Sequence, residues 1–122
     1  MNSDKKALLD TSFILTCVKQ KIDFMNYLYL EGYSILIPKK VINELHGLAE
    51  SHINAKLVLA FIKINNNKIK IIKLTGKNTD NSIINYAKFH PEIIIASLDK
   101  EIKSKTKNKK LVIRGKKKLE VI

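Results

Sequence analysis

Four acidic residues of this 122-residue chain stand where carboxylates could take part in chemistry: Asp10, Glu44, Asp80 and Asp99. Each follows an apolar run typical of a strand, opens a predicted helix, or lies on a helix beside an apolar face. In an open α/β sheet the carboxyl ends of the strands meet at one crevice, so carboxylates distant in sequence can converge there. Clustered carboxylates bind hard cations such as Mg²⁺ or Mn²⁺, which activate water for phosphodiester hydrolysis.

The charge of the chain favours a polyanionic partner. Lys and Arg number 23 against 11 Asp and Glu, a formal net charge of +12, and nucleic acid is the first partner we expect. The segment 103–118 carries basic residues and no acid, which predicts contact with a nucleic-acid backbone. A solvated lysine-rich surface is the alternative interpretation. The basic residues of this segment are Lys103, Lys105, Lys107, Lys109, Lys110, Arg114, Lys116, Lys117 and Lys118.

Hydrophobic periodicity predicts one domain, residues 1–122, in which strands and helices alternate. Such alternation is typical of the α/β class, with a mostly parallel sheet of about five strands and helices on both faces. The strands are expected at residues 6–10, 33–37, 68–74, 93–96 and 111–113, with helices between them.

These elements place the four acids at one edge of the sheet. Asp10 and Asp99 follow strands, Thr79 is expected to cap a helix with Asp80 in its first turn, and Glu44 lies about two turns into a helix. Each acid also has a structural explanation. The three aspartates could cap helices or face helix dipoles, and Glu44 could pair with Lys40 at i, i+4 spacing. Taken together these explanations are weaker, because four independent caps or pairs need not share one edge.

Other features limit the possible classes. No apolar run approaches the ~18 residues of a membrane-spanning helix, so we expect no membrane and a cytoplasmic location. A lone cysteine, Cys17, excludes an intrachain disulfide and is expected to pack in the core. The three histidines lack zinc-ligand spacing. The four tyrosines are expected to serve packing rather than to form a base-stacking platform.

Four short motifs, at residues 8–12, 41–45, 79–83 and 97–101, resemble in order those of the PIN-domain ribonucleases. The resemblance implies a three-layer α/β/α sandwich and endonucleolytic cleavage of RNA with one or two Mg²⁺ or Mn²⁺ ions. In this family pattern Asp10 and Asp99 would be the principal metal ligands, completed by Glu44 and Asp80. Two further residues, Ser12 and Ser97, would orient carboxylates and water.

The chain departs from the family pattern at two positions. Asn81 stands where many members carry another acid, and Leu98 stands where Asn is common. Residues 112–120 resemble the compact archaeal branch of the family, which includes ribosome-assembly and toxin nucleases. The resemblance implies RNA as substrate, and either an antitoxin or a pre-ribosomal particle as partner, with a homodimer in either case. The alternative is a catalytically silent RNA-binding or scaffold module that acts through its basic segment.

Overall fold

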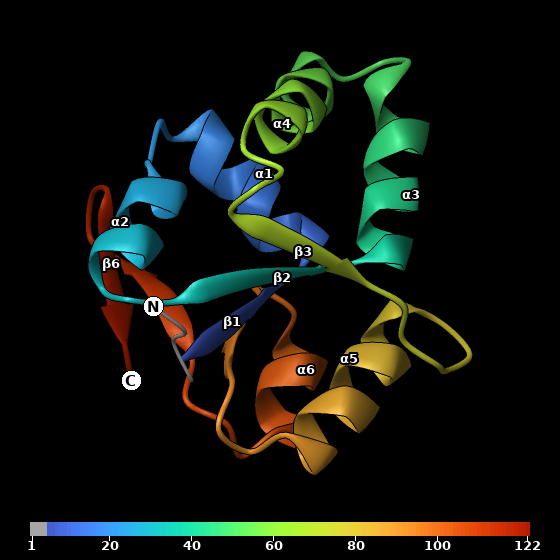
Figure 1. Ribbon diagram of the computed structural model, residues 1–122, viewed down its shortest axis with the longest axis vertical. Helices are drawn as coiled ribbons and strands as arrows, with labels where there is room; N and C mark the ends of the chain where they lie inside the picture. The colour runs from blue at the N-terminus through green and yellow to red at the C-terminus, as the bar shows by residue number, and fades with distance from the viewer. Residues whose placement is uncertain (1–4) are drawn as a thin grey trace.

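The computed structural model describes residues 5–122 and is built on a parallel four-stranded sheet (Figure 1). The strand order is β3-β2-β1-β4, and every neighbouring pair is parallel. Consecutive strands therefore connect through crossovers, as the alternating pattern predicted. The strands are β1 (Lys6–Leu9), β2 (Ser34–Pro38), β3 (Ile69–Ile72) and β4 (Ile94–Ala96).

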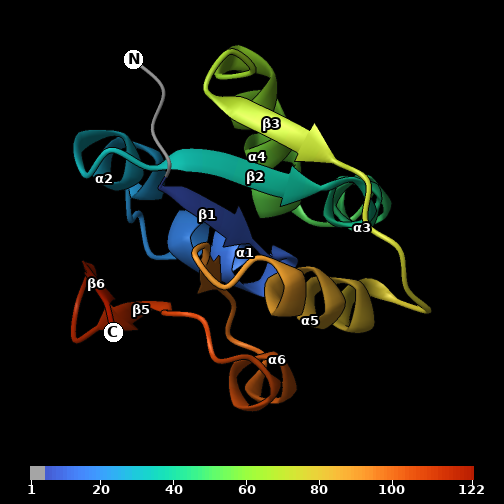
Figure 2. The same cartoon turned by 60° about the horizontal axis from the view of Figure 1, so that its bottom comes forward.

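Helices cover both faces of this sheet, which confirms the expected α/β/α sandwich. Helices α1, α3 and α4 lie on one face and α5 and α6 on the other, while α2 stands beside the amino-terminal ends of the strands (Figures 1 and 2). The helices are α1 (Thr11–Lys19), α2 (Phe24–Leu30), α3 (Lys39–Ala49), α4 (Ile53–Ile64), α5 (Thr79–Phe89) and α6 (Lys100–Lys105).

The central strands form where apolar residues run without alternation, because both faces of a parallel sheet are buried. Leu8 of β1 is in register with Leu36 of β2 on one side and with Ile95 of β4 on the other. All three are at most 4% exposed. This buried register of β1 with β2 and β4 fixes the position of the carboxyl edge of the sheet.

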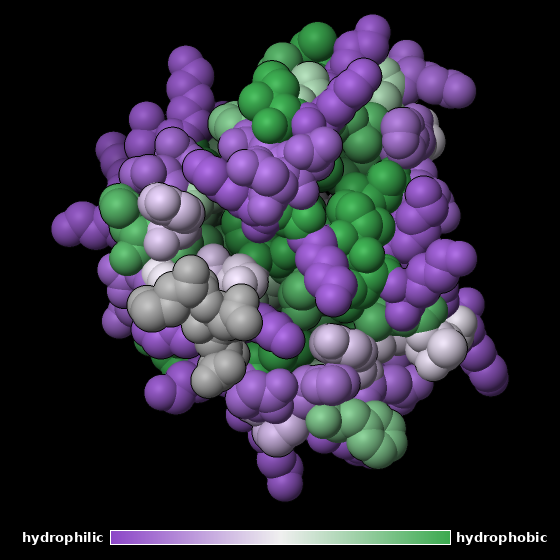
Figure 3. All heavy atoms as spheres, in the orientation of Figure 1, coloured by the Kyte–Doolittle hydropathy of each residue, from purple (hydrophilic) through white to green (hydrophobic). Residues whose placement is uncertain are grey.

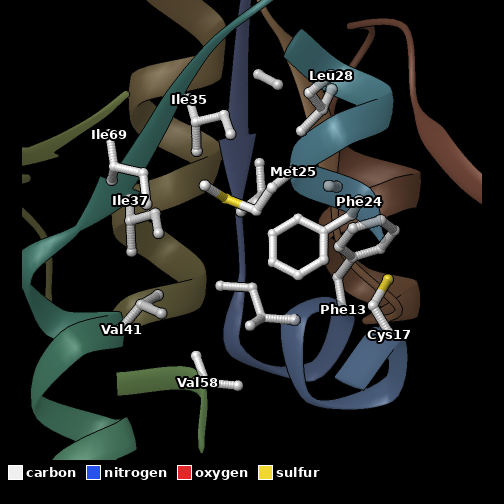
Figure 4. Close-up of a cluster of buried hydrophobic side chains, with 14 of the residues drawn as sticks. Phe13, Cys17, Phe24, Met25, Leu28, Ile35, Ile37, Val41, Val58 and Ile69 are labelled. Atoms are coloured by element: carbon white, nitrogen blue, oxygen red, sulfur yellow. The ribbon is translucent and has the colours of Figure 1, made fainter. Parts of the chain in front are cut away.

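Two buried clusters hold the layers together. The larger fills the space between the sheet and helices α1 to α4, where the rings of Phe13 and Phe24 meet edge to face with centroids 6.2 Å apart (Figure 4). Cys17 is fully buried beside them, and burial raises the pKa of its thiol to about 12. The smaller cluster, which includes Ile83 and Ile102, joins α5 and α6 to the other face. Cys17 is a core side chain, as expected.

The expected fifth strand does not join the parallel sheet. β5 (Leu111–Arg114) pairs antiparallel with β6 (Lys118–Val121), a strand that the sequence analysis did not predict, and touches β4 through one bridge between Ile95 and Lys110. Gly115 and Lys117 both have positive φ, of 52° and 63°, and this reverses the chain. The parallel sheet has four strands rather than five because the tight turn gives β5 a local partner.

The surface seen in Figure 3 carries a band of apolar side chains across its middle, surrounded by hydrophilic ones. β3 is an edge strand, and its Ile71 is 42% exposed. On α4, Leu57 and Phe61 are about half exposed. Within residues 5–122 no helix combines the length and the apolar character needed to cross a bilayer.

Candidate active site

Asp10 lies at the carboxyl end of β1, where its backbone N–H extends the sheet by donating to Ala96 O at 2.9 Å. It is the N-cap of α1, and its Oδ1 accepts from the N–H of Thr11 at 2.8 Å. Its Oδ2 accepts from the hydroxyl of Ser97 at 2.9 Å. Only 6% of Asp10 is exposed. Two hydrogen-bond donors therefore hold the Asp10 carboxylate at the carboxyl edge of the sheet.

The loop after β4 is tied to the same place. Ser97 is 2% exposed, and its oxygen also accepts from the N–H of Asp99 at 3.0 Å. Asp99 caps α6 by accepting from Ile102 N at 3.0 Å. The hydroxyl of Ser12 accepts from the N–H of Leu98 at 3.2 Å, so Ser12 holds this loop rather than a carboxylate. The hydroxyl of Ser97 therefore links the carboxylate of Asp10 to the backbone of Asp99 at the start of α6.

Glu44 reaches the edge from α3, in the second turn of the helix. Its Oε1 accepts from the hydroxyl of Thr11, and its Oε2 accepts from the hydroxyl of Thr79 at 2.9 Å. The suggested partner at i−4, Lys40, donates instead to Gly76 O at 2.8 Å and to Ser82 Oγ at 2.7 Å. Glu44 is consequently held by hydroxyls from α1 and α5.

Asp80 lies in the first turn of α5, as expected, but the helix cap is different. Asn78 is the N-cap and accepts from Asn81 N at 2.9 Å, which leaves Thr79 free to contact Glu44. Burial raises the pKa of the Asp80 carboxyl, and the negative charges of Asp99, Glu101 and Glu44 raise it further. Asp80 and Asp99 therefore approach the site from the face of the sheet that α5 and α6 cover, whereas Glu44 approaches it from the face that α3 covers.

One pocket, with a volume of about 730 Å³, is lined by all four predicted acids. Burial also raises the pKa of Asp10; the hydrogen bonds from Thr11 and Ser97 oppose this shift, and the charges of Glu44 and Asp80 add to it. Ionised carboxylates that share one pocket repel one another, which favours the protonated form of each. Besides the acids, the pocket is lined by Thr11, Ser12, Leu15, Gly47, Leu48 and Leu98.

The donor set around this pocket suits a hard cation, because Mg²⁺ and Mn²⁺ prefer carboxylate oxygens and retain several waters. Burial is the largest cause of the raised pKa values of Asp10 and Asp80, and neighbouring carboxylates add to it, so a bound cation would favour the ionised form of both acids. Among residues 5–122, no three His, Cys, Asp or Glu side chains already stand in a metal-holding arrangement. The residue types that line the pocket fit a hard cation.

Sequence reasoning missed the threonines that hold Glu44. The sequence analysis assigned no contact to Thr11 and only a helix cap to Thr79, which is 9% exposed in the structure. The available signal was that each threonine is adjacent in sequence to an acid of the site, Asp10 or Asp80. The contact itself joins residues 35 positions apart, so local sequence could not reveal it.

The basic segment 103–118 is divided among α6, its following loop and the hairpin. Three of its cations are engaged within the chain. Lys105 lies 2.8 Å from Glu101, Arg114 lies 3.0 Å from Glu120, and Lys110 donates to the carbonyls of Thr106 and Asn108. Partial burial lowers the pKa of Lys110. Exposed lysines without such a described contact remain at Lys107, Lys109, Lys116, Lys117 and Lys118.

Comparison with known proteins adds independent findings. The family described as PIN-like domain matches residues 7–117. Ribonuclease VapC4 of Methanocaldococcus jannaschii is 32% identical over 127 residues, an alignment that covers 95% of each chain. The solved structure of the PIN domain endonuclease Utp24 has a TM-score of 0.77 and 25% identity, and the match covers 95% of this chain and 90% of that one.

Two more distant structures share the fold. PAE2754 from Pyrobaculum aerophilum has a TM-score of 0.56 at 16% identity, covering 84% of this chain and 80% of its own. A chain of VapBC2 from Rickettsia felis, solved with a DNA fragment from their promoter, has a TM-score of 0.54 at 14% identity. That match covers 86% of this chain and 98% of the other. At these identities the likeness concerns the fold alone.

Proposed function

This chain belongs to the PIN-like domain family and is a PIN-domain ribonuclease, and from this premise we propose that it is a metal-dependent endoribonuclease acting through Asp10, Glu44, Asp80 and Asp99. The observation that carries the proposal is that these four acids, contributed by separate elements of the fold, line one pocket. Helix capping alone gives them no reason to share it. Their grouping inside a chain of net charge +12 suits a polyanionic substrate.

The proposed roles are those that the resemblance to PIN-domain ribonucleases implies. Asp10 and Asp99 would be the principal ligands of Mg²⁺ or Mn²⁺, and Glu44 and Asp80 would complete the site directly or through water. When bound, such an ion supplies an activated water and neutralises charge at the scissile phosphate. Ser97 keeps Asp10 oriented, and the hydroxyls of Thr11 and Thr79 hold Glu44 toward the pocket. Exposed lysines would bind the RNA backbone.

The test is cleavage of a labelled structured RNA by the wild type and Asp10→Asn, purified in parallel, with manganese, with magnesium and with chelator. We expect cleavage by the wild type only, and only with metal. RNA binding should be nearly equal in both proteins, because the substitution removes a proposed ligand rather than a phosphate contact. Equal cleavage by both proteins would indicate a contaminating nuclease.

A second candidate function is a silent RNA-binding module with the same fold. It is favoured by one observation, the lack of a preformed three-ligand arrangement among residues 5–122. For this module we expect RNA binding that survives chelator and weakens steeply with salt, with no cleavage under any metal. The assay above separates the two functions.

The biological setting forms the finer part of the proposal. The similarity to Ribonuclease VapC4 and to the PIN domain endonuclease Utp24 supports a nuclease. We propose that it is either a toxin-type enzyme with an antitoxin partner or an RNA-processing enzyme acting in a pre-ribosomal particle. The exposed apolar residues of α4, Ile53, Leu57, Phe61 and Ile64, offer a surface for an antitoxin or for a second copy of the chain. Light scattering of the wild type and Phe61→Glu would test the homodimer, which should dissociate in the variant.

A further inference from the structure

A second pocket, of about 340 Å³, lies along α5 on the side away from the acids. Ser82 lines it, whereas Asp80 lines the acid pocket, and two residues on a helix point about 200° apart. The connection from β3 forms its other wall and contributes Lys73. In Figures 1 and 2 this connection runs out past the amino-terminal end of α5. The pocket is thus close to the acid site in the fold but separate from it.

Aromatic rings dominate this pocket. The rings of Tyr86 and His90 are stacked, with centroids 4.2 Å apart and an interplanar angle of 27°. Phe89 also lines the pocket and is 78% exposed. An exposed ring beside a fixed stack is a surface on which a nucleobase can lie, because every base has a flat face that stacks on aromatic side chains. The tyrosines alone did not predict such a platform, since His90 supplies its second ring.

The polar groups of the pocket match the rest of a nucleotide. Asn85 is exposed and its amide can both donate to and accept from a base edge. Lys73 supplies a cation for phosphate, and no Asp or Glu belongs to the described lining. The volume lies at the low end of the ~300–1,000 Å³ typical of small-ligand pockets. It suits one nucleotide better than a segment of a partner protein.

Hydrogen bonds made by Lys40 and Ser82, which we call the latch, hold the two pockets at fixed positions relative to each other. Lys40 of α3 bonds to both Gly76 O and Ser82 Oγ, and Ser82 Oγ donates to Asn78 O at 2.7 Å. Lys40 precedes Glu44 by about one helical turn, so the wall of the second pocket and an acid of the first are joined through α3. The two pockets therefore keep fixed positions relative to each other, with Asp80 of the first and Ser82 of the second on the same helix.

We propose that this pocket binds an unpaired base of the RNA substrate, a few nucleotides from the scissile phosphate. The inference rests on the ribonuclease function proposed above. It assigns Tyr86, Phe89 and His90 to stacking, Asn85 to the base edge and Lys73 to the backbone.

The test compares Phe89→Ala with Leu30→Ala. These residues are 78% and 70% exposed, so neither truncation should unfold the protein, and Leu30 lies at the end of α2 outside the pocket. Binding of a fluorescein-labelled single-stranded RNA is measured by anisotropy in chelator. Phe89→Ala should weaken binding by about fivefold or more, the effect of losing one base stack, while Leu30→Ala should match the wild type. With an abasic RNA all three proteins should bind equally.

Photocrosslinking gives an independent readout. RNA carrying 5-iodouridine should crosslink to the α5 peptide that contains Tyr86, Phe89 and His90. If the wild type cleaves RNA but Phe89→Ala binds RNA as tightly as the wild type, the proposed base site is wrong. Crosslinks found only outside the α5 peptide would contradict it as well. Either result would leave the proposed nuclease function intact. A wild type that neither binds nor cleaves RNA would overturn both proposals.

Discussion

The hydroxyl of Thr79 donates a 2.9 Å hydrogen bond to Oε2 of Glu44 and thereby joins α5 to α3 across the acid pocket. Thr79 is 9% exposed, so water competes little for this contact. The hydroxyl of Thr11 holds the other carboxylate oxygen from α1. Three helices thus determine the position of one acid.

Replacing Thr79 tests whether this contact matters. Thr79→Val keeps the shape and removes the donor, so we expect cleavage to fall about tenfold, since hydrogen bonds to charged groups are worth ~1.5–3 kcal/mol. Thr79→Ser should retain most activity. Manganese affinity, measured by electron paramagnetic resonance, should fall in the valine variant alone. Equal impairment of both variants would contradict this role of the hydroxyl, because the serine variant keeps the donor and the valine variant keeps the methyl group.

A glycine pair tests the latch that holds the β3–α5 connection. At Gly76, φ is +154°, and an added Cβ would meet Ser82 Oγ at 2.6 Å and Ser82 N at 2.9 Å. Gly76→Ala should therefore lower the free energy of unfolding by about 1–3 kcal/mol. Gly47→Ala is the matched control. Gly47 lies within α3 with open space around it, so alanine should stabilise the protein by about 0.5–1 kcal/mol. Urea titration measures both, and the same sign for both variants would contradict the account.

The raised pKa of Asp80 predicts a pH dependence of stability in the metal-free protein. Because the folded state binds this proton more tightly than the unfolded state, its contribution is complete at acid pH and is lost as the pH rises through the raised pKa. Asp80→Asn removes that loss. In chelator, the variant should gain in melting temperature relative to the wild type as the pH rises toward neutrality. The control is Asp23→Asn. Asp23 caps α2 outside the acid pocket, and asparagine can serve as the same cap, so this variant should show no such gain.

A bound metal ion should offset the repulsion among the four carboxylates of the pocket. If the four acids share an ion, manganese stabilises the folded state by mass action, by ~2.7 kcal/mol at a hundred times its dissociation constant. The melting temperature of the wild type should rise with manganese, and that of Asp10→Asn should rise much less. An unchanged wild-type transition at millimolar manganese would contradict a shared site.

The salt dependence of RNA binding tests whether the exposed lysines of segment 103–118 contribute more than its cations that are paired within the chain. The double variant Lys107→Gln/Lys116→Gln removes exposed lysines, so the slope of log binding constant against log salt should become shallower by about 0.7 for each lost phosphate contact to single-stranded RNA. Lys105→Gln/Arg114→Gln removes the same formal charge from residues paired with Glu101 and Glu120, and its slope should change less. Identical slopes in the two double variants would show that intrachain pairing does not matter for RNA binding.

Local sequence was sufficient for the four strands of the parallel sheet and for the positions of Asp10 and Asp80 relative to the elements that carry them. The runs that form β1 and β4 are apolar on both faces, and a residue just after such a run, as Asp10 is, must lie at the carboxyl edge of a parallel sheet. The first-turn position of Asp80 followed equally from helix periodicity. These features depend on neighbours within a few residues, and the sequence determines them by itself.

Tertiary structure decided the rest. Lys40 contacts Gly76 and Ser82 rather than Glu44. The bond from Thr79 to Glu44 and the stack of Tyr86 on His90 depend likewise on how side chains are oriented. The pairing of β5 with β6 is instead a local feature that the sequence analysis did not predict, since the turn at Gly115 and Lys117 reverses the chain. Hydrophobic pattern specifies which face of an element is buried, but the partner of a hydroxyl, an amine or a ring depends on packing between elements far apart in the chain.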